Sequence, residues 1–395
     1  MRIPLTKPYF DKSEENAVAK VIRSGWVTQG PKVEEFEEAV RKYVGAKYAV
    51  ATTSATTALF LCLHALGIGR GDEVIVPSFS FIATANVVVH AGATPVFVDI
   101  DPKTYNIDPK EIAKAITKKT KAIIPVDQVG LPADYDKIFK IAKKYRLHVI
   151  EDAACALGSV YKRSLKGNFF QDELTRFPYK GKMIGSFGEV ACFSFHPRKA
   201  ITTGEGGMIL TNSKKLAEKL RILRHQGMSV SDVVRHKASK VIKENYPVIG
   251  YNFRMSDIQA AIGVEQMKKL KVILKKRVQI ARYYTKVFST SKNITAPFIP
   301  EGYIHNFQSY IIRLQPNGKI TRDVLMQKLL NAGISTRIGV MAAHLETPYR
   351  KMYPRLALAE TEAATKQTLT IPLYFNMTAK QQDFIISKIL EYAEG

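Results

Sequence analysis

The first two-thirds of the chain alternates short apolar runs with amphipathic ones, and this alternation constrains the fold more than any other feature. Apolar segments bounded by polar or turn residues predict strands at 48–51, 72–77, 94–99, 122–126 and 147–152. Amphipathic segments between them predict helices. A repeated strand and helix order is typical of a parallel sheet covered by helices, so we expect an α/β fold.

Helix signals in the sequence support this order. Asp108 precedes a proline, and Glu111 follows three residues later, which predicts a helix start with a capping box. A second helix is expected at 134–145, with Tyr145 buried. The run at 56–66 is apolar on all sides, as in a helix buried between layers.

A long helix connects this region to the rest of the chain. Ser256 and Gln259 form a predicted capping box, and the helix can run to about Tyr284. Its middle, at 268–277, is basic with an apolar stripe, and we interpret the basic side as a solvated face.

The pattern changes near residue 287, where a strand at 310–314 and a helix near 322–331 are expected. The chain has 395 residues, more than the roughly 250–300 at which a single core stops growing. We therefore expect a segment at 1–13 that packs with the small domain, a large domain at 14–286, and a small α+β domain at 287–395.

The charge balance of the chain is strongly basic, with 59 Lys and Arg residues against 35 Asp and Glu residues, a net charge of +24. This charge predicts attraction to anions, which include nucleic acid, an acidic membrane surface and phosphorylated small molecules. Cys62, Cys155 and Cys192 provide neither a disulfide framework nor a zinc spacing, and we expect no metal site. No signal peptide or membrane-spanning run is evident, so we expect a cytoplasmic protein without a membrane partner.

Two segments that follow predicted strands suit a planar phosphorylated ligand. Small and hydroxyl residues at 52–57, among them Ser54, Ala55 and Thr56, lead into the buried helix, where free backbone N–H groups make a phosphate cup. An ordinary N-cap is the alternative for this segment. Phe81 lies beyond the next strand, where its ring either stacks on a ligand or packs in the core.

Two further segments carry an acid and a lysine. Asp152 ends an apolar strand, where a half-buried carboxylate needs a cationic partner. Lys199 follows an alternating strand and precedes a glycine-rich turn at 203–207, which lets the backbone approach a ligand. A phosphate cup, a stacking ring, a carboxylate and a lysine together match the needs of pyridoxal phosphate (PLP), whose aldehyde forms a Schiff base with a lysine.

With these motifs the chain resembles the DegT/DnrJ/EryC1/StrS family of PLP-dependent aminotransferases, which act mostly on keto sugars attached to nucleotides. The resemblance extends from 24–31 through 250–255 to 369–373, with the motifs in the family's order. It implies the PLP-dependent transferase fold of type I, with a large, mostly parallel-sheet domain and a small α+β domain. It also implies a homodimer with shared active sites.

The resemblance further implies roles for single residues. Lys199 matches the lysine that forms the Schiff base and moves a proton, and Asp152 matches the partner of the pyridine nitrogen. Phe81 matches the stacking aromatic, Ser194 a phosphate ligand, and Asn252 a residue that reaches the phosphate of the neighbouring subunit. The cofactor-binding set it implies is Ser54, Ala55, Thr56, Phe81, Asp152, Cys155, Ser194, Lys199 and Asn252.

Some positions depart from the family pattern. Cys155 stands where the family usually has a glutamine that contacts the cofactor ring hydroxyl, and we interpret it as a small packing residue. The segment 125–130 replaces a version that usually contains histidine, and Gln308 lies where many members carry a histidine. The interval 161–179 looks like an insertion, either a substrate contact or a surface loop. The substrate residues that the resemblance implies are Trp26, Thr28, His196, Arg254, Arg337 and His344.

The implied function is transfer of an amino group, from glutamate as the usual family donor, to a keto group of a nucleotide-linked sugar. Lys199 argues against the family's sugar dehydratases, in which histidine replaces the lysine. A cyclitol, a benzoate precursor or another keto acceptor stays open. The alternative of a different class is a basic nucleic-acid-binding regulator, but no helix-turn-helix, zinc or RNA-binding signature supports a specific nucleic-acid partner.

Overall fold

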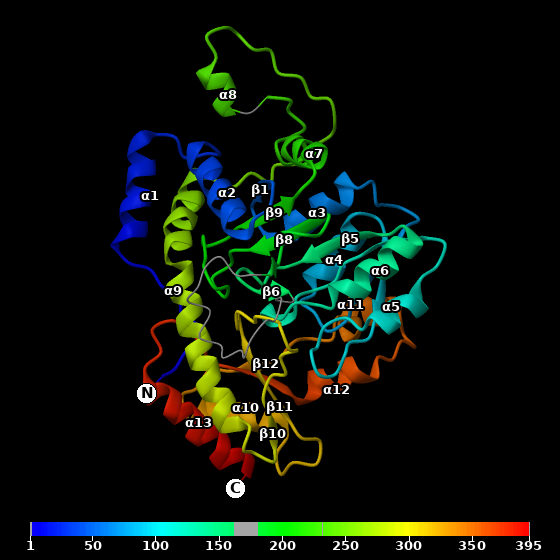
Figure 1. The fold of residues 1–395 in the computed structure, drawn as a ribbon, viewed down its shortest axis with the longest axis vertical. Helices are drawn as coiled ribbons and strands as arrows, with labels where there is room; N and C mark the ends of the chain where they lie inside the picture. Colours follow the sequence, from blue (N-terminus) through cyan, green and yellow to red (C-terminus); the bar gives the residue numbers. More distant parts are fainter. Residues whose placement is uncertain (1, 162–180, 231, 395) are drawn as a thin grey trace.

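The computed structural model describes residues 2–161, 181–230 and 232–394, and a seven-stranded sheet lies at its centre (Figure 1). β9 runs antiparallel to both of its neighbours, and the pairs between β8 and β3 are parallel. The α/β prediction with a mostly parallel sheet is confirmed. In spatial order the strands are β1 (Tyr48–Thr52), β9 (Gly207–Thr211), β8 (Val190–Ser194), β5 (His148–Asp152), β4 (Thr120–Ile123), β2 (Glu73–Pro77) and β3 (Thr94–Val98).

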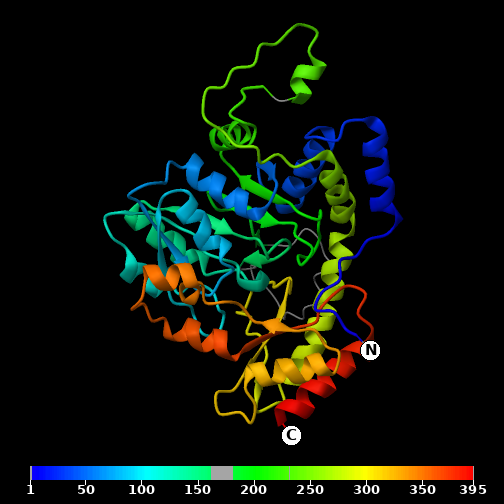
Figure 2. The ribbon, with the colours of Figure 1, turned by 180° about the vertical axis from the view of Figure 1, so that it is seen from behind.

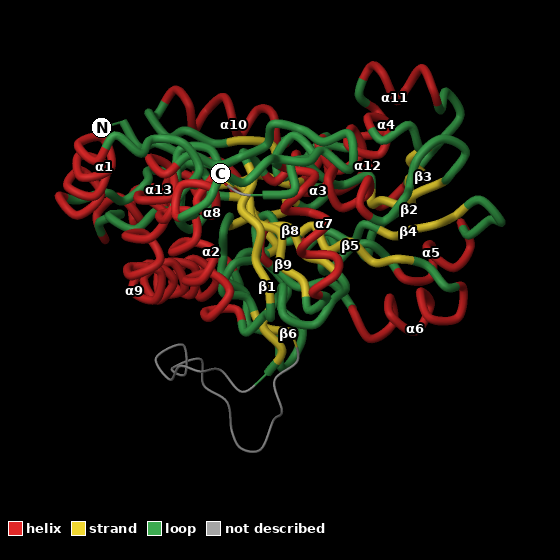
Figure 3. Tube along the Cα trace, turned by 90° about the horizontal axis from the view of Figure 1, so that it is seen from above, coloured by secondary structure: helices red, strands yellow, loops and turns green. Residues whose placement is uncertain are grey.

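Helices cover both faces of this sheet, because successive side chains of a strand point to opposite sides. In β5, Val149 and Ile150 accordingly belong to two different cores. Figure 3 shows the strands between the two helical layers. The Val149 side carries α2 (Pro31–Val44), α5 (Pro109–Ala115), α6 (Tyr135–Tyr145) and α9 (Asp257–Phe288), and the Ile150 side carries α3 (Ala55–Ala65), α4 (Ala83–His90) and α7 (Lys214–Arg224).

The helix predictions for this region are confirmed with two corrections. Most of α3 is buried, as its apolar sequence predicted. Asp108 caps α5, but Glu111 forms an ion pair with Lys114 at 2.6 Å, so no capping box closes there. The predicted burial of Tyr145 is wrong, since 41% of it is exposed. It is the last residue of α6, and the chain turns away at Arg146 in the left-handed conformation, with φ of 55°.

Helix α9 connects the two sheets of the molecule. Its start after Ser256 and the capping box with Gln259 are confirmed, and it ends one turn beyond the predicted end. The prediction that the basic side of this helix is solvated is only partly correct. Arg277 is 3% exposed and donates to the carbonyl groups of 307–308, while Lys269 binds two carboxylates near the N-terminus. These two cations therefore have structural partners.

The C-terminal part forms a second sheet whose four strands are antiparallel (Figure 2). The predicted strand at 310–314 and helix at 322–331 are confirmed. Ile3 pairs with Ile334 and is buried in the core of this part. The domain boundaries remain a prediction. The elements are β10 (Ile294–Thr295), β11 (Tyr310–Leu314), β13 (Thr368–Ile371) and β12 (Arg337–Ile338), with α10 (Arg322–Asn331), α11 (Thr347–Met352), α12 (Ala359–Gln367), α13 (Ala379–Glu394) and the 3₁₀ turn η3 (Ala343–Leu345).

The remaining described elements lie at the periphery. The segment that contains α8 projects from the body of the molecule (Figure 1). The predicted insertion lies outside the described residues from position 162 onward. These elements are α1 (Lys12–Ser24), the turn η1 (Gln128–Gly130), the paired strands β6 (Val160–Tyr161) and β7 (Lys182–Met183), and α8 (Asp232–Lys237).

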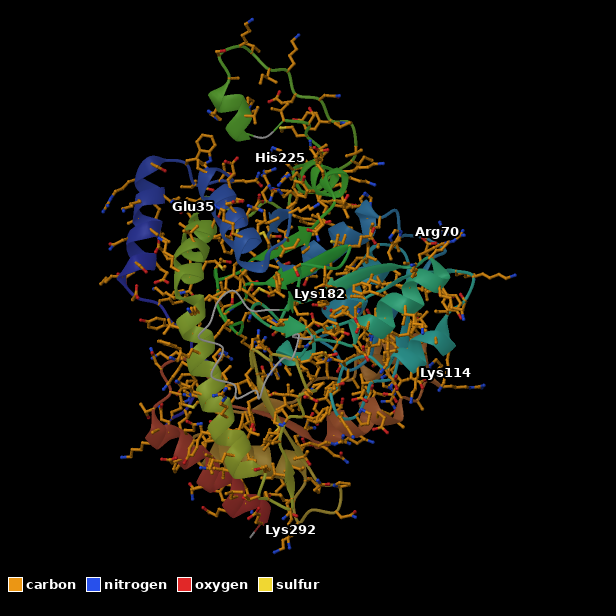
Figure 4. The ribbon with its side chains drawn as sticks, viewed as in Figure 1. Glu35, Arg70, Lys114, Lys182, His225 and Lys292 are labelled. Carbon is orange, nitrogen blue, oxygen red and sulfur yellow. The ribbon has the colours of Figure 1, made fainter. Side chains whose placement is uncertain are left out.

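Many of the excess cations point outward, as Figure 4 shows for Arg70, Lys114 and Lys292. Within the described ranges, no helix is long and apolar enough to cross a membrane. The same residues hold no group of three or more His, Cys, Asp or Glu side chains placed to bind a metal ion.

Candidate active site

The segments predicted to carry function follow the ends of strands in the central sheet. Ser54 comes after β1, Phe81 after β2 and Lys199 after β8, and Asp152 is the last residue of β5. β2, β5 and β8 run in the same direction, and β1 shares it because both β1 and β8 are antiparallel to β9. The carboxyl ends of these strands therefore meet at one edge, where open α/β sheets bind ligands.

The N-terminus of α3 has the geometry of a phosphate cup. Ser54 is the N-cap, and its hydroxyl accepts a hydrogen bond from the Thr57 amide at 3.1 Å. Helix geometry leaves the amides of Ala55 and Thr56 without acceptors inside the helix. They lie at the positive end of the helix dipole, where a phosphate is stabilised. The N-cap and the cup are therefore compatible roles of one segment.

A glycine brings Ser194 close to this cup. Ser194 pairs with Gly207 across β8 and β9. A Cβ atom at Gly207 would lie 2.3 Å from the carbonyl carbon and oxygen of Ser54, and 2.6 Å from the hydroxyl of Thr52. Only glycine leaves room for this approach. Two segments that are far apart in the sequence thus lie side by side at the site.

Asp152 is buried at the end of β5 and surrounded by donors. Its carboxyl group accepts hydrogen bonds from the Thr84 hydroxyl at 2.8 Å and from the Ala154 amide at 3.2 Å. The hydroxyl of Ser80 lies 2.8 Å from that of Thr84. Burial raises the pKa of Asp152, and the two hydrogen bonds and the charge of Lys199 oppose this rise. The two donors and the lysine charge therefore offset part of the cost of burying a carboxylate, which could bind a protonated ring nitrogen.

Lys199 reaches back from its loop to the segment after β5. Its Nζ lies 3.1 Å from Sγ of Cys155. The loop is held by the Lys199 amide, which donates to the carbonyl of His196 at 2.8 Å. The side-chain amide of Gln308 adds a bond to the carbonyl of Arg198 at 2.7 Å. Cys155 is only half-buried, and its sulfur contacts the amine, so it is more than the packing residue we predicted.

Two phenylalanines that follow β2 have opposite environments. Phe79 is completely buried and packs against Tyr105 and Ile311. Phe81 is 61% exposed, so the alternative of core packing for this ring is wrong. An exposed aromatic ring at this edge is available for stacking on a planar ligand.

The predicted substrate residue His344 is enclosed in the protein. It is 1% exposed, and its Nδ1 lies 2.6 Å from the Ser78 hydroxyl. Its Nε2 lies 3.5 Å from a carboxylate oxygen of Glu362. Burial lowers the pKa of His344, against the effect of Glu362. The burial favours a structural role, in which His344 connects η3 to the segment after β2.

Trp26 and Thr28 lie at the entry to α2. The indole Nε1 of Trp26 donates to the carbonyl of Gln29 at 3.1 Å, and its ring meets His236 edge-on with centroids 4.8 Å apart. Thr28 is exposed, and its carbonyl accepts from the Asp257 amide. Trp26 thus connects the projecting α8 segment with the body of the molecule.

The segment of Asn252 and Arg254 lies beside the cup, because the Phe253 carbonyl accepts a hydrogen bond from the Thr53 amide at 3.1 Å. Arg254 lies 3.0 Å from Nδ1 of His225, which Figure 4 places at the base of the projecting segment. Asn252 is exposed.

His196 and Arg337 occupy different surroundings. His196 is half-buried in the loop before Lys199, and its Nε2 lies 4.0 Å from a carboxylate oxygen of Glu205. Burial is the main cause that lowers the pKa of His196. Arg337 is exposed on β12 of the second sheet. The structure thus joins His196 to the lysine loop and leaves Arg337 on another element.

The sequence analysis missed Thr84, the residue that donates to Asp152. Thr84 lies in the first turn of α4, and its hydroxyl group among apolar neighbours was the signal available in the sequence. The bond from Gln308 to the lysine loop joins residues 110 positions apart in the sequence, and no local pattern predicts it.

Comparisons with known proteins agree with this geometry. The profile of the DegT/DnrJ/EryC1/StrS aminotransferase family matches residues 8–390. The uncharacterized protein MJ1066 of Methanocaldococcus jannaschii is 39% identical over 95% of this chain and 94% of its own length. The spore coat polysaccharide biosynthesis protein SpsC of Bacillus subtilis is 36% identical over 100% and 97%.

Solved structures are similar over the whole chain. The putative sugar aminotransferase Spr1654 of Streptococcus pneumoniae has a TM-score of 0.89 at 29% identity, covering 100% of this chain and 99% of its own, and a PLP form of it is known. PseC of Helicobacter pylori, an aminotransferase of pseudoaminic acid biosynthesis, has a TM-score of 0.87 at 28% identity, with 100% of both chains covered. The chain therefore belongs to the DegT/DnrJ/EryC1/StrS aminotransferase family and is a PLP-dependent aminotransferase of fold type I.

Proposed function

We propose that this protein transfers an amino group from glutamate to the keto group of a nucleotide-linked sugar. The observation that carries the proposal is the position of Lys199 Nζ, 3.1 Å from Cys155 Sγ, at the sheet edge that also holds Asp152 and the start of α3. The names of SpsC and PseC, which refer to polysaccharide and pseudoaminic acid biosynthesis, support a sugar acceptor.

The residues at this edge fit PLP. The amides of Ala55 and Thr56 are free to hold its phosphate, and the approach at Gly207 adds the hydroxyl of Ser194. The exposed ring of Phe81 would hold one side of the cofactor ring. When bound, PLP supplies a ring that accepts the electrons left on carbon when a proton is removed.

Asp152 and Lys199 would have different roles in the reaction. The carboxylate of Asp152 would keep a proton on the ring nitrogen. The donors Thr84 and Ala154 orient this carboxylate and oppose the rise in its pKa that burial causes. Lys199 would hold the cofactor at rest and, once freed as an amine, would carry a proton between two carbon atoms. Gln308 fixes the lysine loop, so the amine works from one position.

The acceptor would bind next to the cup through some of the substrate residues that the family resemblance implies. The net charge of +24 attracts a substrate with a pyrophosphate group, and Arg254 beside the cup is a suitable cation. We propose that Trp26, Thr28 and His196 take part in substrate binding. We further propose that a homodimer forms and that Asn252 serves the site of the second subunit.

The test is a two-stage reaction of the PLP-loaded protein. Glutamate alone should change the visible absorbance of the bound cofactor and release its keto acid in an amount equal to the protein. A panel of nucleotide-linked keto sugars should then restore the original spectrum. Lys199→Ala should retain bound cofactor but should release no keto acid. Restoration by a keto cyclitol, with no response to any sugar nucleotide, would support the alternative acceptor, and failure of every amino donor would overturn the proposal.

A further inference from the structure

Two carboxyl groups lie buried on the opposite side of β5 from the donors of Asp152. Asp127 follows β4, Glu151 is the residue before Asp152, and both are 0% exposed. Burying two carboxylates together is costly, because each loses its hydration and repels the other. Neither acid belongs to the set that would touch the cofactor, so their presence needs a separate reason.

Each carboxyl group has one satisfied oxygen and one free oxygen. Oδ1 of Asp127 accepts from the Ala133 amide at 2.9 Å and from the Tyr135 hydroxyl at 3.0 Å. Oε1 of Glu151 accepts from the Gly185 amide at 3.1 Å. Oδ2 of Asp127 and Oε2 of Glu151 are buried without a hydrogen-bond partner among the described residues.

The two side chains are neighbours, because the Asp127 amide donates to the carbonyl of the residue that follows Glu151 and the two carboxyl groups interact through a hydrogen bond. If both groups are ionised, neither oxygen can donate a hydrogen bond and both stay unsatisfied, which destabilises the folded protein. One proton between them satisfies both at once. A buried acid and its conjugate base sharing a proton is how adjacent carboxyl groups avoid mutual repulsion.

Among the described residues, the groups that act on the pair include Tyr135 from α6, whose neutral hydroxyl donates to Asp127, and the carboxyl group of Asp152 from the same strand. Neither carries a positive charge. Burial raises the pKa of both Asp127 and Glu151. The charge of Asp127 raises the pKa of Glu151 further, whereas a hydrogen bond from Glu151 lowers the pKa of Asp127. Gly188 approaches Glu151 closely enough that an added Cβ would lie 3.3 Å from Oε2, so the pair is tightly enclosed.

We propose that Asp127 and Glu151 share one proton between Oδ2 and Oε2 and that the joined pair is a positioning element for Asp152. The backbone connects them directly, since the Asp127 amide donates to the Asp152 carbonyl at 3.1 Å and the Asp152 amide donates to the Pro125 carbonyl at 2.9 Å. The pair therefore ties the loop after β4 to the end of β5 that presents Asp152. This role is independent of the identity of the acceptor.

The direct test is infrared spectroscopy of the PLP-loaded protein at neutral pH, with Asp127→Asn and Glu151→Gln as comparisons. The wild-type protein should show a protonated-carboxyl band that both variants lose, because an amide N–H replaces the shared proton and the remaining acid ionises. The band should fade in the wild type as pH rises. Absence of such a band from the wild-type spectrum, or its persistence in both variants, would overturn the proposal whether or not the amino-transfer reaction is found.

A second measurement is the pH dependence of unfolding. The pKa of Asp127 is raised to about 7 from an unfolded value near 4, so the folded state binds more protons and wild-type stability should fall as pH rises across this range. Glu151→Gln should flatten this fall, since its amide makes the bond at every pH. Glu37→Gln is the matched control, because Glu37 is buried against Arg224 at 2.5 Å and its loss should cost stability without flattening the curve.

The positioning role also has a catalytic readout. The kcat of the wild-type protein should fall at alkaline pH, where the pair of Asp127 and Glu151 ionises. Glu151→Gln should remain active to higher pH. Glu151→Ala, which cannot replace the proton, should not show this rescue. Equal alkaline limbs in the wild type and the glutamine variant would show that the pair serves stability alone and would refute the positioning role.

Discussion

Replacing Thr84 by valine removes a hydroxyl from Asp152 with almost no change in side-chain size. Thr84 is 2% exposed, and its hydroxyl donates to Oδ2 of Asp152 at 2.8 Å. A hydrogen bond to a charged group contributes about 1.5–3 kcal/mol, and one pKa unit corresponds to about 1.4 kcal/mol. The loss should therefore raise the pKa of Asp152 by about one to two pH units.

A raised pKa of Asp152 should move the acid side of the pH profile of activity to higher pH. Asp152 must be ionised to hold a proton on the cofactor nitrogen, so activity is lost as pH falls through its pKa. In Thr84→Val this acid limb should lie about one to two pH units higher than in the wild type. Thr84→Ser keeps the hydroxyl and should restore the wild-type profile. The assay is kcat/KM against pH, with cofactor present in excess.

A matched control separates this effect from general destabilisation. Thr361 is also buried, and its hydroxyl donates to Asp99 at 2.7 Å, outside the group of contacts around Asp152. Thr361→Val should lower stability by a similar amount but leave the acid limb in place. An unchanged acid limb in Thr84→Val, or the same shift in both variants, would refute the argument that Thr84 tunes Asp152.

Two further predictions concern packing around the site and along α9. Gly207→Ala places a methyl group 2.3 Å from the cup backbone and should weaken PLP binding at least about tenfold, or about 1.4 kcal/mol. Titration of the apoprotein with PLP measures this, with Gly318→Ala as a control, and wild-type affinity in Gly207→Ala would contradict it. Arg277→Met leaves two buried carbonyl groups without their donor and should lower the free energy of unfolding by about 2–3 kcal/mol in urea titrations. The exposed Lys275→Met should change it by less than about 0.5 kcal/mol, and equal effects of the two variants would contradict the assigned role of Arg277.

The strand ends were the part of the site that the sequence predicted best. Apolar runs with polar residues after them located Asp152 and Lys199, because the sheet geometry brings such ends to one edge. The same rule does not distinguish Phe79 from Phe81, because both follow β2. Only the structure separates their roles, since Phe79 is buried and Phe81 is exposed.

Long-range partners were beyond local patterns. Arg277 reads as one more cation in a basic helix, and its burial depends on carbonyl groups about thirty residues away. The capping box expected at Asp108 does not form, because Glu111 forms an ion pair with Lys114 in the next turn. Asp127 and Glu151 look like ordinary strand-end acids, and only the fold shows that both are buried and that each has an oxygen without a hydrogen-bond partner among the described residues.

The central claim is that Lys199 is the residue that holds the cofactor and performs the transfer. Borohydride reduction of the PLP-loaded protein, followed by proteolysis and mass spectrometry, tests it most directly. We predict one modified peptide, with the added cofactor mass on Lys199, and none in Lys199→Ala. Modification of another lysine at equal yield, or a protein that takes up no PLP, would contradict the account.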